Sequence, residues 1–191
     1  MNDLQKAIEV ISQGGIVVFP TDTAYGIGCR MDNEKAIKKL FKIKKRPENQ
    51  AAPVLFDSYS RIDEYVLPYE PRVKHLMKKY WPGALTVITV CIESKVPLLV
   101  RGGGKTLGVR IPNHEIPMEL IRSAGSPILA PSANFHGEKT PYIFKELDKA
   151  LLKLVDFVIE GETKGSLSST VVDCSKNPWE IVRQGAILLD V

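Results

Sequence analysis

Four short polar segments of the sequence carry side chains that could bind a small polar ligand beside an anion. The first is TDTAYG at residues 21–26, which follows an apolar run, and the second is KKRP at residues 44–47. The third is SAN at residues 132–134, and the fourth is SST at residues 168–170, followed later by Arg183. Cations combined with hydroxyls and an amide suit a phosphate chain beside a small polar acid. Chemistry at such a site would depend on positioning and charge.

Arg110 joins these segments from within a short apolar stretch at residues 107–111. Val109 and Ile111 flank it, so in a pleated strand its side chain points to the face opposite theirs. Each signal alone also has an ordinary explanation, such as a turn, a cap or a solvated lysine face. From the residues alone, the interpretation stops at an α/β domain with an anion-binding cleft.

Several familiar catalytic signatures are incomplete. GKT at residues 104–106 resembles the end of a phosphate-binding loop, but Leu99 stands where that pattern needs a glycine. GIG at residues 26–28 resembles a dinucleotide fingerprint, but Met31 replaces its third glycine. The histidines are far apart in the sequence, and neither a zinc-protease motif nor a nucleophile elbow occurs. The sequence therefore disfavours a metalloprotease or a serine hydrolase, and we predict no metal-binding residues.

Length and composition indicate an ordinary globular protein. The chain has 191 residues, of which 44% are hydrophobic and 25% charged, and we expect one domain over residues 1–191. The net charge of +4 allows an anionic substrate or RNA but proves neither. We find no apolar run of membrane-spanning length and no signal peptide. Three scattered cysteines favour reduced thiols, so we expect a cytoplasmic protein that does not enter a membrane.

The elements that must position these segments alternate between strand and helix in the first two-thirds of the chain. One predicted helix is capped by Asn33 and ends before Pro47. The other predicted helices cover residues 4–13, 61–66, 71–80, 116–124 and 142–155. The predicted strands cover residues 16–19, 53–56, 85–92, 107–111, 128–130, 157–159, 170–174, 180–183 and 187–189. This pattern predicts an α/β fold with a twisted, open mixed sheet and flanking helices.

The order of the polar segments is more specific than any one of them. FPTDTAYGIG, KKRP, WPGALT, GVRIP, APSAN, SSTVVD and IVRQG follow one another along the chain. Together they resemble the YrdC-type family of L-threonylcarbamoyladenylate synthases, in its short, single-domain form. The resemblance covers nearly the whole chain and implies a YrdC-like fold with a basic concave cleft.

This resemblance also implies a reaction. L-threonine, bicarbonate and ATP, with Mg²⁺, would give threonylcarbamoyl-AMP and pyrophosphate. A separate complex would then transfer the threonylcarbamoyl group to tRNA. In the family's motifs, the tetrad at the nucleotide site corresponds to Lys44, Arg46, Ser132 and Asn134. Within that tetrad we predict that Lys44 and Arg46 are catalytic.

The remaining predicted contacts divide between the two substrates. Further ATP contacts implied by the resemblance are Thr106, Thr140 and Arg183. The implied threonine contacts are Thr21, Tyr25, Arg110 and Ser169. The sequence departs from the family pattern at Ala24, where valine is common, and in two longer segments. Ala51-Ala52 replaces the Pro-Leu of many members, and the loop at residues 101–105 is unusually rich in glycine, which would allow it to close over a substrate.

Two alternative functions remain open. A basic concave domain could bind double-stranded RNA or tRNA directly, without any role for ATP. A related carbamoyl-adenylate chemistry could also use another amine or carbamoyl donor. The presence of Thr21, Arg110 and Ser169 favours threonine over that second alternative.

Overall fold

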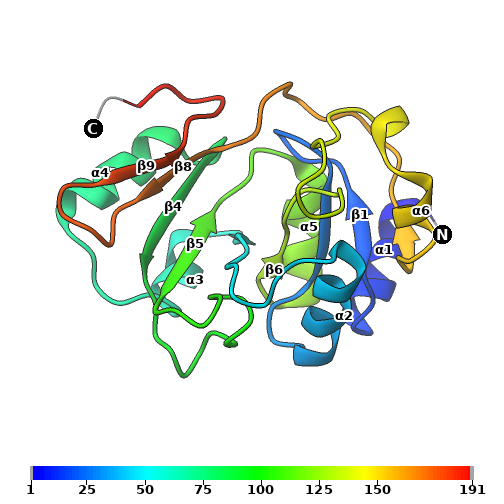
Figure 1. Cartoon of the computed structure of the whole chain (residues 1–191), viewed down its shortest axis with the longest axis horizontal. Coiled ribbons are helices and arrows are strands. Elements are labelled where there is room, and N and C mark those ends of the chain that lie inside the picture. The colour runs from blue at the N-terminus through cyan, green and yellow to red at the C-terminus, as the bar shows by residue number, and fades with distance from the viewer. Residues whose placement is uncertain (1, 190–191) are drawn as a thin grey trace.

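The protein is built around one mixed β-sheet, as its computed structural model, which describes residues 2–189, shows (Figure 1). The strands are β1 (Val17–Phe19), β2 (Gly26–Arg30), β3 (Val54–Leu55), β4 (Leu85–Val90), β5 (Thr106–Arg110), β6 (Ile128–Leu129), β7 (Phe157–Val158), β8 (Thr170–Asp173) and β9 (Glu180–Arg183). Their order in the sheet is β7-β1-β2-β6-β3-β5-β4-β8-β9. The pairs β1/β7, β3/β5 and β4/β8 are parallel and the other neighbours antiparallel.

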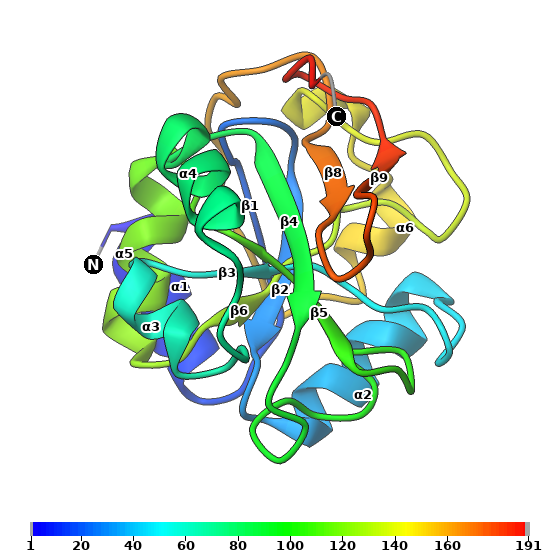
Figure 2. The same cartoon turned by 90° about the vertical axis from the view of Figure 1, so that its left-hand side faces the viewer.

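Helices cover both faces of this sheet. They are α1 (Asp3–Ser12), α2 (Glu34–Lys44), α3 (Tyr59–Asp63), α4 (Pro71–Tyr80), α5 (Glu115–Ala124) and α6 (Lys149–Leu152), with a short 3₁₀ turn at Phe144–Glu146. In Figure 2, α1, α3, α4 and α5 lie on one side of the strands, and α2 and α6 on the other. The predicted α/β fold with a mixed sheet and flanking helices is therefore confirmed. Within residues 2–189, every helix is too short or too polar to cross a bilayer.

Both faces of strand β1 are buried, each in a different apolar cluster. Val17 and Phe19 are buried in a cluster with α1 and α5, whereas Ile16 and Val18 are buried in the larger cluster that includes α2. Because both faces are covered, the strand is a continuous apolar run and not an alternating one.

Capping residues set the limits of helices α1 and α2. Asn2 and Gln5 form a capping box at the start of α1. The side chain of Asn33 accepts a hydrogen bond from the amide of Ala36 and caps α2, as predicted. The helix ends at Lys44, and the residue that caps it, Lys45, has a left-handed φ of 52°. This helix end carries the basic segment toward the face of the sheet.

One central strand was missed in the sequence. We expected a polar turn at residues 21–26 and no strand after it, but β2 lies between β1 and β6. A methyl group at Gly28 would lie 2.8 Å from atoms of both Phe19 and Ile128. Glycine is therefore required by close packing, and its presence hid the strand pattern.

Two predicted elements are wrong. The helix predicted over residues 142–155 is interrupted, because Leu147 is extended and Asp148 caps a new short helix, α6. The strand predicted over residues 187–189 does not form. There, the backbone N–H and C=O of Ile187 both bond to the hydroxyl of Thr170 and not to a neighbouring strand.

Candidate active site

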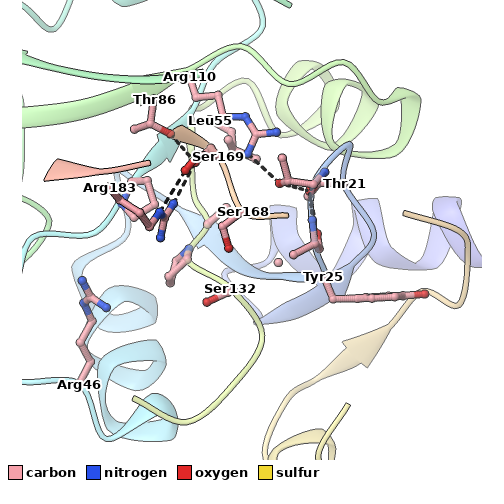
Figure 3. Close-up of a pocket in the computed structure, with 16 residues that line it drawn as sticks. Thr21, Tyr25, Arg46, Leu55, Thr86, Arg110, Ser132, Ser168, Ser169 and Arg183 are labelled. Carbon is pink, nitrogen blue, oxygen red and sulfur yellow. Dashed lines mark hydrogen bonds between the residues drawn. The ribbon is translucent and has the colours of Figure 1, made fainter. Parts of the chain in front are cut away.

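One cavity collects most of the predicted site residues (Figure 3). Its volume is about 160 Å³, whereas a single water needs only about 10–15 Å³. The predicted residues that line it are Thr21, Tyr25, Arg46, Arg110, Ser132, Ser169 and Arg183. Three of these are arginines, and no carboxylate is among the described residues that line the cavity. The cavity therefore suits a small polar molecule that carries negative charge.

Strand register places Arg110 in the wall of the cavity. Leu55 of β3 pairs with Arg110 of β5, so the two side chains lie on the same face. The register that pairs Val87 with Val109 puts Thr86 of β4 on the other side of Arg110. All three residues line the cavity. The alternation predicted for residues 107–111 is confirmed, since Val109 is fully buried in the core.

The guanidinium of Arg110 is held by three hydrogen bonds. Nε donates to the carbonyl of Gly83 at 2.9 Å, Nη1 to Oγ1 of Thr23 at 2.9 Å and Nη2 to Oδ1 of Asp22 at 2.5 Å. The side chains of Arg110 and Asp22 are 8% and 6% exposed. Because a guanidinium has five N–H groups, two remain to bind a ligand. Asp22 was not among our site residues, although a buried arginine calls for such a partner.

Thr21 fixes the turn between β1 and β2. Its hydroxyl donates to the carbonyl of Ala24 at 2.7 Å and accepts from the amides of Thr23 and Ala24 at 3.1 and 3.2 Å. The Thr21 oxygen also lies 3.1 Å from the hydroxyl oxygen of Thr23, so its hydrogen-bonding positions are filled within the turn. Thr21 therefore shapes the cavity that it lines, and its predicted contact with threonine stays a prediction. Thr23 supplies the neighbouring hydroxyl on Arg110.

A pair of hydroxyls, from Thr86 of β4 and from Ser169 just before β8, forms another part of the cavity wall. Oγ of Ser169 is 2.9 Å from Oγ1 of Thr86 and accepts from Nη2 of Arg183 at 3.0 Å. Nε of Arg183 also donates to the carbonyl of Ser169 at 3.0 Å. Burial lowers the pKa of Arg183, with a further lowering by the charge of Arg110. Sequence reasoning missed Thr86, which is one of two threonines within the otherwise apolar strand LTVITV.

Lys44 lies beside the cavity and not in its lining. Its Nζ donates to the carbonyls of Ser132 and Asn134, each at 2.5 Å. The Ser132 hydroxyl donates to Oδ1 of Asn134 at 2.5 Å. Lys44 thus fastens the Ser-Ala-Asn turn to the end of α2. Burial, with a smaller effect from the charge of Arg46, lowers the pKa of Lys44 to about 7.

The remaining predicted residues differ in how near they come to the cavity. Arg46 reaches it from the end of α2 and lies opposite the Thr21 turn in Figure 3. The ring of Tyr25 points away from the cavity in the same view, and its hydroxyl exchanges hydrogen bonds with the backbone of Gly161. Thr106, Thr140 and Asn134 do not line the cavity. Their predicted contacts with ATP stay predictions.

Comparison with known proteins agrees with the ordered motifs. A family model named Sua5_yciO_yrdC, described as telomere recombination, matches residues 9–185. The chain belongs to the Sua5/YciO/YrdC family. The resemblance inferred from the motifs is therefore confirmed, and the sheet with its flanking helices is this family's fold.

Three relatives illustrate the similarity. The threonylcarbamoyl-AMP synthase of Bacillus subtilis is 34% identical, over 97% of this chain and 55% of its own length. The threonylcarbamoyl-AMP synthase of Xanthomonas euvesicatoria is 33% identical, over 98% of this chain and 97% of its own. The crystal structure of Pyrococcus abyssi Sua5 complexed with L-threonine matches with a TM-score of 0.90 and 32% identity, over 95% of this chain and 54% of its own. This chain thus spans about half the length of the first and third relatives.

Proposed function

We propose that this protein is an L-threonylcarbamoyladenylate synthase, which converts L-threonine, bicarbonate and ATP into threonylcarbamoyl-AMP and pyrophosphate. The observation that carries the proposal is the cavity itself. Arg46, Arg110 and Arg183 meet there with serine and threonine side chains, and none of the described residues that line it is a carboxylate. Two relatives with the same reaction in their names, and a third with L-threonine bound, support this choice.

Threonine would occupy the part of the cavity beside Arg110. The two N–H groups of Arg110 that Gly83, Thr23 and Asp22 leave free would bind its carboxylate in a charge-assisted contact. Ser169 and its partner Thr86 would bond to the threonine hydroxyl. We propose that Tyr25 acts by supporting this wall, since its own hydroxyl is bonded to Gly161.

ATP would lie toward the end of α2. Arg46 and Arg183 would bind the phosphates, with Lys44 adding positive charge from beneath the Ser132–Asn134 turn. Thr106 and Thr140 stay predicted contacts with more distant parts of the nucleotide. Mg²⁺ would arrive bound to the phosphates and water, because the lining residues within the described part of the chain offer it no carboxylate.

The proposed reaction requires the carbamate and the α-phosphorus of ATP to be held in line. The neutral amine of threonine attacks the carbon of bicarbonate, water leaves, and a carbamate forms. A carbamate oxygen then attacks the α-phosphorus of ATP, and the bond from that phosphorus to the bridging oxygen breaks. Pyrophosphate leaves with the bonding electrons, and the arginines stabilise its charge. This chemistry needs no side-chain nucleophile.

The first test is pyrophosphate release from Mg·ATP by the purified protein, with and without L-threonine and bicarbonate. We expect release that requires both. Release with bicarbonate alone would indicate the related carbamoyl chemistry. The absence of release under every condition, together with RNA binding that weakens steeply with salt, would replace the proposal with RNA binding by the exposed lysines of α2.

Two variants test the proposed contacts with the phosphates of ATP. Losing one contact to charge that develops in the transition state costs roughly 100- to 1,000-fold in turnover. We expect losses of that size for Arg46→Ala and for Lys44→Ala, and near-normal turnover in both would exclude the assigned roles.

The cellular setting follows from the proposed reaction. We propose that residues 1–191 act as one domain in the cytoplasm, where the free thiols of Cys29, Cys91 and Cys174 would stay reduced. The product would pass to a separate complex that transfers the threonylcarbamoyl group to tRNA. Direct RNA binding is not needed for this step.

A further inference from the structure

The segment after α2 holds the guanidinium of Arg46 in place. Nε of Arg46 donates to the carbonyl of Gln50 at 3.1 Å, and Nη2 donates to the carbonyl of Ala51. The position of this cation therefore depends on where the backbone of residues 49–51 lies. Its side chain is only partly buried, and these two are the hydrogen bonds that its guanidinium makes within the described part of the chain.

The glycine-rich loop at residues 101–104 packs directly against that backbone. A methyl group at Gly102 would lie 2.5 Å from the nitrogen of Ala51, 2.9 Å from the oxygen of Asn49 and 3.0 Å from the carbonyl carbon of Gln50. All three are backbone atoms, which cannot rotate away. The amide of Ala52 also donates to the carbonyl of Val100 at 3.0 Å, so the two segments are joined.

The loop is itself anchored and cannot easily yield. Nε of Arg101 donates to the carbonyl of Val96 at 3.2 Å, and Nη1 bonds to Glu93 at 3.0 Å. The Arg101 side chain is only 12% exposed. Turn hydrogen bonds join Gly102 to Leu99 and Gly103 to Leu98. A larger residue at position 102 would therefore displace residues 49–51 sooner than its own loop.

We infer that Gly102 is a positioning residue that sets the place of Arg46 through the backbone of residues 49–51. The inference rests on the proposed function in that Arg46 is taken to bind ATP. It also brings the two longer departures from the family pattern together at one contact. A proline at position 51 would put its ring on the nitrogen that Gly102 approaches, whereas Ala51 leaves that nitrogen open.

Two glycine variants separate this role from a general loop effect. Gly102 and Gly103 have φ values of +58° and +79°, so alanine is strained at both. A methyl group at Gly103, however, would meet nothing within 4 Å. We expect Gly102→Ala to weaken ATP binding by about tenfold to 100-fold, the loss expected when a hydrogen bond to a charged group is removed. Gly103→Ala should leave ATP binding near the wild-type value.

The readout is the dissociation constant of ATP by calorimetry, with KM values for ATP and threonine measured below the melting temperature of each variant. A loss of folded protein would lower the amount of active enzyme and change neither KM, whereas displacement of Arg46 should raise the KM for ATP alone. Equal effects of the two glycine variants, or an equal rise in both KM values, would overturn the inference.

A double variant tests whether Gly102 acts through Arg46. In an Arg46→Ala background, Gly102→Ala should change ATP affinity little, because the group it displaces is gone. An undiminished effect in that background would overturn the inference. If Gly102→Ala does not fold, Arg101→Gln releases the same loop without adding atoms, and an unchanged ATP affinity in that variant would count against the inference.

These measurements distinguish the inference from the proposed function. Wild-type protein that binds ATP but releases no pyrophosphate would overturn the synthase, while the ATP affinities of the variants would still decide the role of Gly102. Wild-type protein that does not bind ATP would overturn both.

Discussion

Arg110 and Lys44 are both buried cations beside the cavity, but they are compensated differently. Arg110 is paired with the carboxylate of Asp22, so its charge is balanced inside the protein. Lys44 donates to two backbone carbonyls and has no ion-pair partner among the described residues. Burial therefore lowers the pKa of Lys44 to about 7, where ligand charge can change its protonation.

The first prediction concerns the pH dependence of ATP binding. Phosphates near Lys44 should raise its pKa above the free value of about 7. ATP affinity should then be highest below pH 7 and should fall as pH rises through 7, because binding takes up a proton. Calorimetry at pH 8 in two buffers of different ionisation enthalpy measures that uptake. Lys44→Met should abolish it, whereas the exposed control Lys45→Met should retain it.

The second prediction concerns the buried ion pair. Asp22→Asn leaves the charge of Arg110 buried without compensation, and breaking such a pair costs about 3–5 kcal/mol. Urea unfolding should show a loss of this size. The control Asp32→Asn breaks a pair with Arg30 in which the Asp32 side chain is 49% exposed, so it should cost no more than about 1 kcal/mol. Similar losses of stability in Asp22→Asn and Asp32→Asn would contradict the conclusion that Asp22 compensates the buried charge of Arg110.

At the scale of elements, the β8–β9 unit holds Ser169 and Arg183 together. The side chain of Thr170 at the start of β8 accepts hydrogen bonds from the amides of Gly185 and Ile187, at 2.9 and 3.0 Å. These bonds fold the chain after β9 back over residues 168–170. A methyl group at Gly185 would lie 2.6 Å from the carbonyl carbon and oxygen of Ser169 and against the oxygen of Ser168.

The third prediction follows from that close approach. Gly185→Ala should displace Ser169, raise the KM for threonine and lower stability by about 1–3 kcal/mol, as overpacking does. Steady-state kinetics and thermal unfolding measure the two effects. Gly104→Ala is the matched control, because a methyl group there has its nearest contact at 3.4 Å. A normal KM for threonine in Gly185→Ala would contradict this prediction, because it would show that the methyl group does not disturb the position of Ser169.

At the scale of the whole molecule, the sheet brings segments from both ends of the sequence to one cavity. The β1–β2 turn, β3, β4, β5 and β9 all contribute lining residues. Ligands that join these segments should therefore stabilise the entire fold and not one local region.

The fourth prediction is the size of that stabilisation. A ligand at 100 times its dissociation constant adds about 2.7 kcal/mol, and each kcal/mol shifts the melting temperature by roughly 2–4 °C in a protein of this size. ATP at that concentration should raise the melting temperature by roughly 5–11 °C, as measured by scanning calorimetry, and L-threonine should add to this shift. Arg46→Ala should lose the part of the shift that ATP provides. An RNA-induced shift without one from ATP would support the alternative function.

The sequence by itself determined the elements and segments whose signals are local. Helices α2 and α4 and strand β4 follow from periodicity, caps and β-branched residues. The ordered motifs also indicated seven residues that line the cavity. Tertiary structure decided which groups these residues contact. It paired Asp22 with Arg110, fastened the Ser-Ala-Asn turn to Lys44, and required glycine at positions 28 and 102. Periodicity and capping act within a few residues, whereas charge compensation and close backbone contact depend on segments that meet only in the folded sheet.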